Sequence, residues 1–291
     1  MTLILVQLIL SGLVLGAIYA LIALGYVIIY KATSVVNFAQ GEAVMVGAYI
    51  ALSVYSFMHL PVPLVFAITV AIAAVLGVTI ERVAYRRLVG APVISLIIAT
   101  LAVGLILRNV VRLVFGPNVY PFPPLIANRP LRFGGLVTTP QNLLILGVAV
   151  ACMVLLFVYF RYTKWGKAMR AVSQNGTAAV LMGISVRKVF SMIWALSAGL
   201  GALAGVLLAP LLVVNPDMGW IALKAFVVAI LGGFQSLPGA VLGGFALGIL
   251  ENLAGFYIGS AVKDIVAYVV LIAILIARPT GLFAERTGKR V

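Results

Sequence analysis

The stretch RYTKWGKAMRAVSQNGTAAVLMGISVRKVFSMI, residues 161–193, is the longest polar and basic passage in a chain that is otherwise almost continuously apolar. It holds six Lys and Arg residues and no Asp or Glu. Integral membrane proteins concentrate Lys and Arg in their cytoplasmic loops. The stretch therefore predicts a cytoplasmic loop, about residues 161–190, between two membrane-spanning segments.

The composition supports this interpretation for the whole chain. Hydrophobic residues make up 64% of the 291 residues, charged residues make up 9%, and the mean hydropathy is +1.24. A water-soluble domain of this composition would expose large apolar patches. Because a helix needs about 20 apolar residues to cross a bilayer, we expect an all-α integral membrane protein, a polytopic bundle of about 8–10 transmembrane helices with broken or re-entrant elements. Residues 1–291 then form a single transmembrane domain.

The net charge of +14 could also suggest a nucleic-acid-binding protein. The Lys and Arg residues, however, occupy short loops and span ends, such as residues 81–90, and are not gathered on one folded polar surface. Membrane topology explains this pattern better, so we expect membrane lipid and no nucleic acid among the partners. Counting spans from the basic loops places the C-terminus in the cytoplasm and the N-terminus outside.

A polar break at residues 30–49 follows the first predicted span, which covers about residues 3–26. Asn37, Gln40 and Glu42 interrupt apolar sequence there without a long hydrophilic loop. Transporters place non-helical backbone at membrane depth beside the transport path. The three residues are therefore candidates for the translocation path. The alternative is that Gln40 and Glu42 only cap the second span at an interface.

Three further features complete the expected layout. Residues 116–140 hold six prolines and cannot form one continuous helix, so they predict an ordered external loop. Arg108 and Arg112 lie four residues apart on one face of the fourth predicted span, where they either snorkel to the interface or face a carboxylate ligand. A second break, FQSLPG at 234–239, precedes a glycine-rich helix. The tract at 239–245 resembles that at 41–47, which is weak support for an internal repeat.

No constellation in the sequence indicates catalysis. There is no phosphate-binding G-x-x-x-x-G-K-[ST] motif, and no nucleophile is spaced with a plausible base. The single His59 has no Cys, Asp or second His near it, so we predict no metal site. We expect no cofactor and no enzyme activity in this chain.

A spaced pattern lies inside the basic stretch. Ala178 and Ala179 are followed after three residues by Gly183 and after nine more by Ile193. This resembles the loop by which permease subunits of ABC importers dock on their ATPases. The family pattern begins with Glu and ends in Leu and Pro, where this chain has Thr177, Ala195 and Leu196. A short amphipathic helix ending in a glycine turn forms a compact knob. The candidate coupling residues are Ala178, Ala179, Gly183 and Ile184; the alternative is an ordinary interfacial loop.

The whole chain resembles the permease subunits of branched-chain amino-acid ABC importers, in particular the smaller of the two paralogous permeases. The likeness is carried by GAIYALIALGYVIIY (16–30), VVNFAQGEAVMVGAY (35–49), AAVLMGI (178–184), AFVVAILGGFQSLPGAVLGG (225–244) and ARPTGLF (277–283).

The resemblance implies a multi-pass protein of the bacterial inner membrane. Its implied partners are a second homologous permease, two ATPase subunits and a periplasmic substrate-binding protein. The implied substrates are leucine, isoleucine and valine, although related permeases serve short amides, urea or aromatic acids. The alternative function is an ion-coupled secondary transporter or channel, which would need ionisable residues in mid-span; Glu42 and Glu251 are the candidates.

Overall fold

The computed structural model describes residues 2–126, 129–133, 135–278 and 280–283. Seven helical segments in these ranges are long and apolar enough to cross a membrane. They are α1 (Thr2–Thr33), α2 (Gln40–Met58), the segment Val62–Leu88, α4 (Val93–Phe115), α5 (Pro140–Tyr162), α8 (Val186–Leu208) and α10 (Leu237–Tyr257). The expected polytopic helical membrane protein is confirmed.

Shorter elements connect these spans. The segment Val62–Leu88 consists of α3 (Val62–Ile80), a π-helical turn η1 (Glu81–Tyr85) and a 3-10 turn η2 (Arg86–Leu88). The others are α6 (Lys164–Gln174), α7 (Gly176–Leu181), η3 (Met218–Trp220), α9 (Ile221–Gly232), α11 (Val262–Ala277), β1 (Leu131–Phe133) and β2 (Leu136–Thr138). The structure has seven long segments in the described residues where about 8–10 spans were expected, because α9 with 12 residues and α11 with 16 are shorter than a full span.

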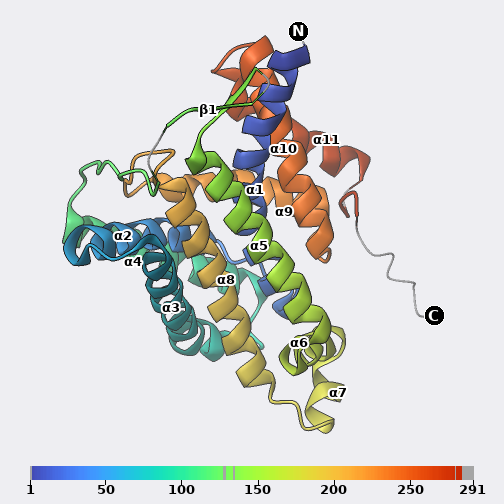
Figure 1. Ribbon diagram of the computed structural model, residues 1–291. Coiled ribbons are helices and arrows are strands. Elements are labelled where there is room, and N and C mark those ends of the chain that lie inside the picture. The colour runs from blue at the N-terminus through green and yellow to red at the C-terminus, as the bar shows by residue number, and fades with distance from the viewer. Residues whose placement is uncertain (1, 127–128, 134, 279, 284–291) are drawn as a thin grey trace.

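Helix α1 forms the centre of the bundle, with α5, α8, α9 and α10 packed around it (Figure 1). Every residue from Ala17 to Ile29 is buried, as expected for a helix that is apolar on all its faces. Gly12 and Gly16 of α1 face the backbone of α10, and a Cβ added at Gly12 would lie 2.7 Å from the Cα of Ile249. The small residues of α1 therefore allow the backbones of α1 and α10 to approach closely.

Helices α1 to α4 and helices α8 to α11 pack in the same pattern. Helix α1 packs on α10 as α8 packs on α3, and α2 packs on α8 as α9 packs on α1. The contact of α2 with α4 is matched by the contact of α9 with α11. In this arrangement α2 corresponds to α9, whereas the likeness between residues 41–47 and 239–245 suggested α10.

Both broken elements are present. The chain leaves α1 after Thr33 and crosses residues 34–39 without helical structure before α2 begins at Gln40. Val35, Asn37 and Ala39 are buried in this segment, so irregular backbone lies inside the protein, where it is tolerated at membrane depth. The second break separates α9 from α10, and Gly233 at φ 89° supplies its turn.

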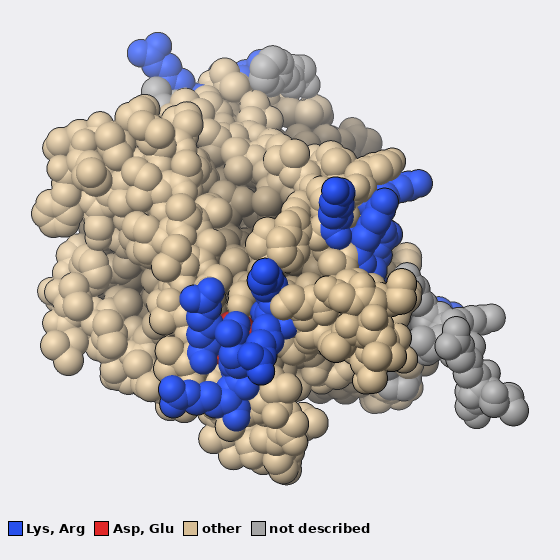
Figure 2. Space-filling view, turned by 90° about the horizontal axis from the view of Figure 1, so that it is seen from below, with Lys and Arg blue, Asp and Glu red and all other residues tan. Residues whose placement is uncertain are grey.

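The two ends of the bundle differ in chemistry. At one end, the β1–β2 hairpin is tied to the start of α1, where Gln7 Oε1 accepts a 3.0 Å hydrogen bond from Val137 N. The opposite end, formed by η1, η2, the last turn of α5, α6, α7 and the first turn of α8, is called the basic end here. Figure 2 shows Lys and Arg side chains gathered on this face. The expected loop at 81–90 is largely a continuation of α3 through η1 and η2.

Candidate functional site

Helix α6 begins at a sharp bend after α5. Thr163 lies between the two helices, and its Oγ1 accepts a 2.9 Å hydrogen bond from Gly166 N, which caps the new helix. Met169 and Val172 of α6 are buried, whereas Lys164 and Lys167 are exposed. The predicted cytoplasmic loop is therefore an amphipathic helix packed against the end of the bundle, followed by a second short helix.

The segment from Asn175 to Ile184 forms a knob beyond α6. Asn175 Oδ1 accepts a 3.0 Å hydrogen bond from Ala178 N and caps α7. At the other end Ile184 N donates to Ala179 O and Gly183 N donates to Val180 O, both at 2.9 Å. Together with Gly183 at φ 78°, these bonds form a Schellman turn. The glycine predicted from the sequence pattern is thus the residue that closes the helix.

The tip of this knob is apolar and exposed. Leu181 and Met182 are 83% and 82% exposed, among the most exposed large apolar side chains in the described chain. Ala178 is also exposed, whereas Ala179 is only 3% exposed because it faces the body of the protein. Leu181 and Met182 are not among the coupling residues predicted from the sequence. Their position beside the turn glycine was the available signal.

The surroundings of the knob are strongly basic. Exposed Lys and Arg residues of the basic end are Arg82, Arg87, Arg161, Lys164, Lys167, Arg170, Arg187 and Lys188. Among the described Asp and Glu residues only Glu81 lies at this end, and it is buried in an ion pair with Arg86 at 2.6 Å. The knob therefore presents two apolar side chains within a field of positive charge, which suits a partner with an acidic rim around an apolar groove.

A second polar group lies at the start of α2. Glu42 is buried and pairs with Arg108 of α4. Arg108 in turn lies 3.9 Å from Asp217, and Arg112 pairs with Asp217 at 2.8 Å. The ring of Trp220 lies under the Arg108 guanidinium, 5.2 Å from ring centre to carbon. These five residues are called the Glu42 cluster; both arginines bind carboxylates of the same chain.

The other two predicted path residues lie inside the bundle. Gln40 Nε2 donates to Ser197 O at 3.1 Å, and the Ser197 hydroxyl lies 2.8 Å from Gln40 Oε1. Asn37 Oδ1 accepts from Ala39 N at 3.1 Å within the break itself. Both side chains are buried in the protomer. Of the three predicted residues, Glu42 alone is connected to an exposed group, through Arg108 to Asp217.

The second mid-span carboxylate is also paired. Glu251 of α10 is fully buried and lies 3.1 Å from Lys224 of α9. Lys224 also binds Asp264 of α11 at 2.7 Å, and Tyr19 of α1 donates to Glu251 at 2.8 Å. Each of the two mid-span carboxylates therefore has a cation of the same chain as its partner.

Apolar helices around buried ion pairs, with an exposed knob at a basic end, define a multi-pass membrane transport protein. A family model described as "Branched-chain amino acid transport system / permease component" matches residues 8–275. The chain belongs to this family. It is a permease subunit of the ABC transport class, which has no catalytic activity of its own.

Curated relatives match over nearly the full length. The high-affinity branched-chain amino acid transport system permease protein LivH of Escherichia coli K12 is 33% identical over 97% of this chain and 96% of its own. The corresponding protein BraD of Pseudomonas aeruginosa is 35% identical over 98% of this chain and 97% of its own length. A probable LivH of Methanocaldococcus jannaschii is 31% identical over 95% and 92%. No solved structure matches the chain.

Proposed function

We propose that this chain is one of two permeases of an ABC importer that moves branched-chain amino acids inward. Its partners are then a second homologous permease, two ATPase subunits and a substrate-binding protein outside the membrane. The names of the relatives, which are branched-chain amino acid transport permeases, support the substrate class. The basic end then faces the cytoplasm of a bacterial inner-membrane protein, in line with the distribution of Lys and Arg, and the N-terminus lies outside.

The knob is the observation that carries the coupling part of this proposal. ATPase subunits must transmit motion to the permease through a compact element that enters a groove and stays rigid. The Asn175 cap and the Schellman turn at Gly183 fix this element at both ends. Leu181 and Met182 supply the apolar contact, Ala178 allows close approach, and Ala179 and Ile184 hold the knob against the protein.

The Glu42 cluster indicates where the translocation path could run, because part of it is exposed and charged. Asp217 is 54% exposed in its side chain, and Arg112 and Trp220 beside it are also largely open. A free amino acid carries one carboxylate and one ammonium group, which Arg112 and Asp217 complement. We place the path along this cluster, with Glu42 at its inner side and with Asn37 and Gln40 supporting the broken backbone that borders it.

Uptake into vesicles that contain all subunits tests this function. Labelled leucine should accumulate only when ATP and the binding protein are both present. Accumulation driven by an ion gradient without ATP would overturn the assignment in favour of a secondary carrier. ATP-dependent uptake of a different solute would overturn the substrate and leave the importer.

A further inference from the structure

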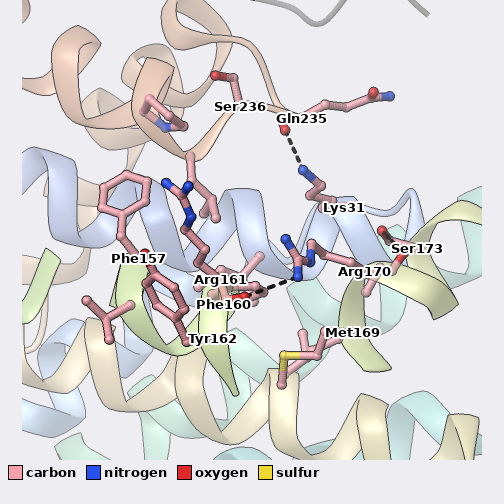
Figure 3. A pocket seen from close by; sticks show the side chains of 16 residues that line it. Lys31, Phe157, Phe160, Arg161, Tyr162, Met169, Arg170, Ser173, Gln235 and Ser236 are labelled. Atoms are coloured by element: carbon pink, nitrogen blue, oxygen red, sulfur yellow. Dashed lines mark hydrogen bonds between the residues drawn. The ribbon is translucent and has the colours of Figure 1, made fainter. Parts of the chain in front are cut away.

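A pocket of about 760 Å³ lies where the ends of α1 and α5 meet α6 and the turn between α9 and α10 (Figure 3). Small-molecule sites have volumes of about 300–1,000 Å³, so the pocket is large enough for a ligand. Its walls come from four segments that are distant in the sequence. Neither the knob nor the Glu42 cluster uses this space.

Three cations project into the pocket from three different helices, as Figure 3 shows for Lys31, Arg161 and Arg170. Lys31 Nζ donates to Gln235 O at 3.1 Å, and Arg170 donates to Arg161 O at 3.3 Å. Within the described residues none of the three pairs with a carboxylate. Converging positive charges without counter-charges create a strong potential for an anion.

The remaining walls are apolar. Buried side chains of Ile28, Met169 and Ile193 line the inner part, and Phe157 lines the side toward α5. A small inorganic anion would satisfy the cations but leave this apolar surface in contact with water. The ligand that matches both parts is an amphiphile with an anionic head and an apolar body.

The pocket lies beside an exposed apolar surface of α5. Val158 lies at its rim, and Val154, four residues earlier and thus on the same face of the helix, continues the surface along the bilayer. Both valines are exposed in the chain. Arg161 lies in the last turn of this span, just before the amphipathic α6, so the cations lie at the depth of lipid head groups.

We propose that this pocket binds an anionic phospholipid. Its phosphate lies among Lys31, Arg161 and Arg170, and one acyl chain runs along Val158 and Val154. Basic pockets between transmembrane helices at the cytoplasmic side have this preference for acidic head groups. The competing explanation is that the second permease or an ATPase subunit covers the pocket.

Native mass spectrometry of the assembled transporter tests the proposal. The complex is incubated with equal amounts of phosphatidylglycerol and phosphatidylcholine, and the lipids retained per complex are counted. The variant is Arg161→Gln with Arg170→Gln. Its matched control is Arg82→Gln with Arg87→Gln, which removes the same charge from the same end but outside the pocket.

The wild type should retain phosphatidylglycerol in preference to phosphatidylcholine. The pocket variant should lower this retention roughly tenfold, and the control should change it by about twofold or less. Arg161→Lys with Arg170→Lys should keep most of the retention because it keeps the charge. If the Gln variant does not assemble, Lys31→Gln alone should still lower retention measurably.

Three results would overturn the site. Equal losses in pocket variant and control would indicate general surface charge. Displacement of the lipid by an equal concentration of soluble glycerol phosphate would show that the apolar walls bind nothing. Loss of a partner subunit from the pocket variant, with lipid retention unchanged, would show that a protein covers the pocket.

Discussion

The hydroxyl of Tyr19 on α1 donates a 2.8 Å hydrogen bond to the buried carboxylate of Glu251 on α10, and Lys224 of α9 lies 3.1 Å from the same carboxylate. Three helices are therefore joined at one acidic group that has no access to solvent. Removing the cation leaves a buried charge without compensation, which costs far more than removing the whole pair.

Lys224→Met should therefore destabilise the chain by roughly 3–5 kcal/mol. Lys224→Met combined with Glu251→Gln should recover most of this loss, since no bare charge remains. Thermal unfolding of the purified protein in detergent measures both. Lys188→Met, at an exposed position, is the control and should leave stability unchanged. If the double variant is no more stable than Lys224→Met, the unpaired charge of Glu251 is not the cause of the destabilisation.

Gly183→Asp should uncouple ATP hydrolysis from uptake, whereas Gly183→Asn should keep a measurable part of the coupling. No atom lies within 4 Å of a Cβ at this glycine, and Asn and Asp both tolerate its left-handed backbone at a modest cost. The two variants differ mainly in the charge that would be desolvated in a partner's groove. Co-purification of ATPase subunits and ATP-dependent uptake report the difference. Normal uptake by Gly183→Asp would show that the knob is not the coupling element.

Replacing the apolar tip should weaken ATPase binding without unfolding the permease. Leu181→Ser with Met182→Ser removes two exposed side chains, each of which contributes about 1.5–3 kcal/mol when buried in a groove. The swap Leu181→Met with Met182→Leu keeps the apolar surface and serves as control. Affinity for the ATPase subunits should fall for the Ser variant and stay near wild type for the swap. Equal affinities would place the contact elsewhere on the basic end.

Gly16→Ala should destabilise the pairing of α1 with α10 by about 1–3 kcal/mol, because overpacking forces the backbones apart. Its Cβ would lie 2.6 Å from Gly244 O. Gly147→Ala on α5 meets nothing within 4 Å and should be neutral or slightly stabilising, as expected for Ala in a helix. Thermal unfolding of the two variants compares them directly. Equal stability would mean that α1 and α10 separate at little cost.

A cysteine at Asn37 should react with a water-soluble thiol reagent in at least one nucleotide state of the full transporter. The residue is buried in the protomer, so labelling requires the path to open beside it. Cys152 is replaced first, and Thr69→Cys, buried on α3 away from the Glu42 cluster, should stay unlabelled throughout. Protection of position 37 in every state would favour a purely structural role for the break.

The sequence alone predicts the features that depend on local pattern. Apolar length predicts the spans, the spacing of Gly12 and Gly16 predicts a close helix contact, and Gly183 predicts the end of the knob. Each of these depends on residues within a few turns. The burial of Ala179, by contrast, depends on how α7 lies against the rest of the protein, which the pattern does not contain.

Ion pairs between residues far apart in the chain could not be predicted from the sequence. Glu42 and Arg108 are 66 residues apart, and both could be explained locally, one as a helix cap and the other as a snorkelling side chain. Only the packing of α2 on α4 brings them together. The same holds for the correspondence of α2 with α9, which follows from contacts and not from similar residues.

The α2–α4 contact and the matching α9–α11 contact are both ion pairs, but the charges are reversed between them. On α2 the acid Glu42 binds the base Arg108 of α4, whereas on α9 the base Lys224 binds the acid Asp264 of α11. If the halves exchanged partners during insertion, α2 against α11 would oppose two acids and α9 against α4 would oppose two bases. Like charges opposed at these contacts repel each other, most strongly at the buried Glu42. The inverted polarity therefore discriminates against swapped assembly, so that α2 pairs with α4 and α9 pairs with α11.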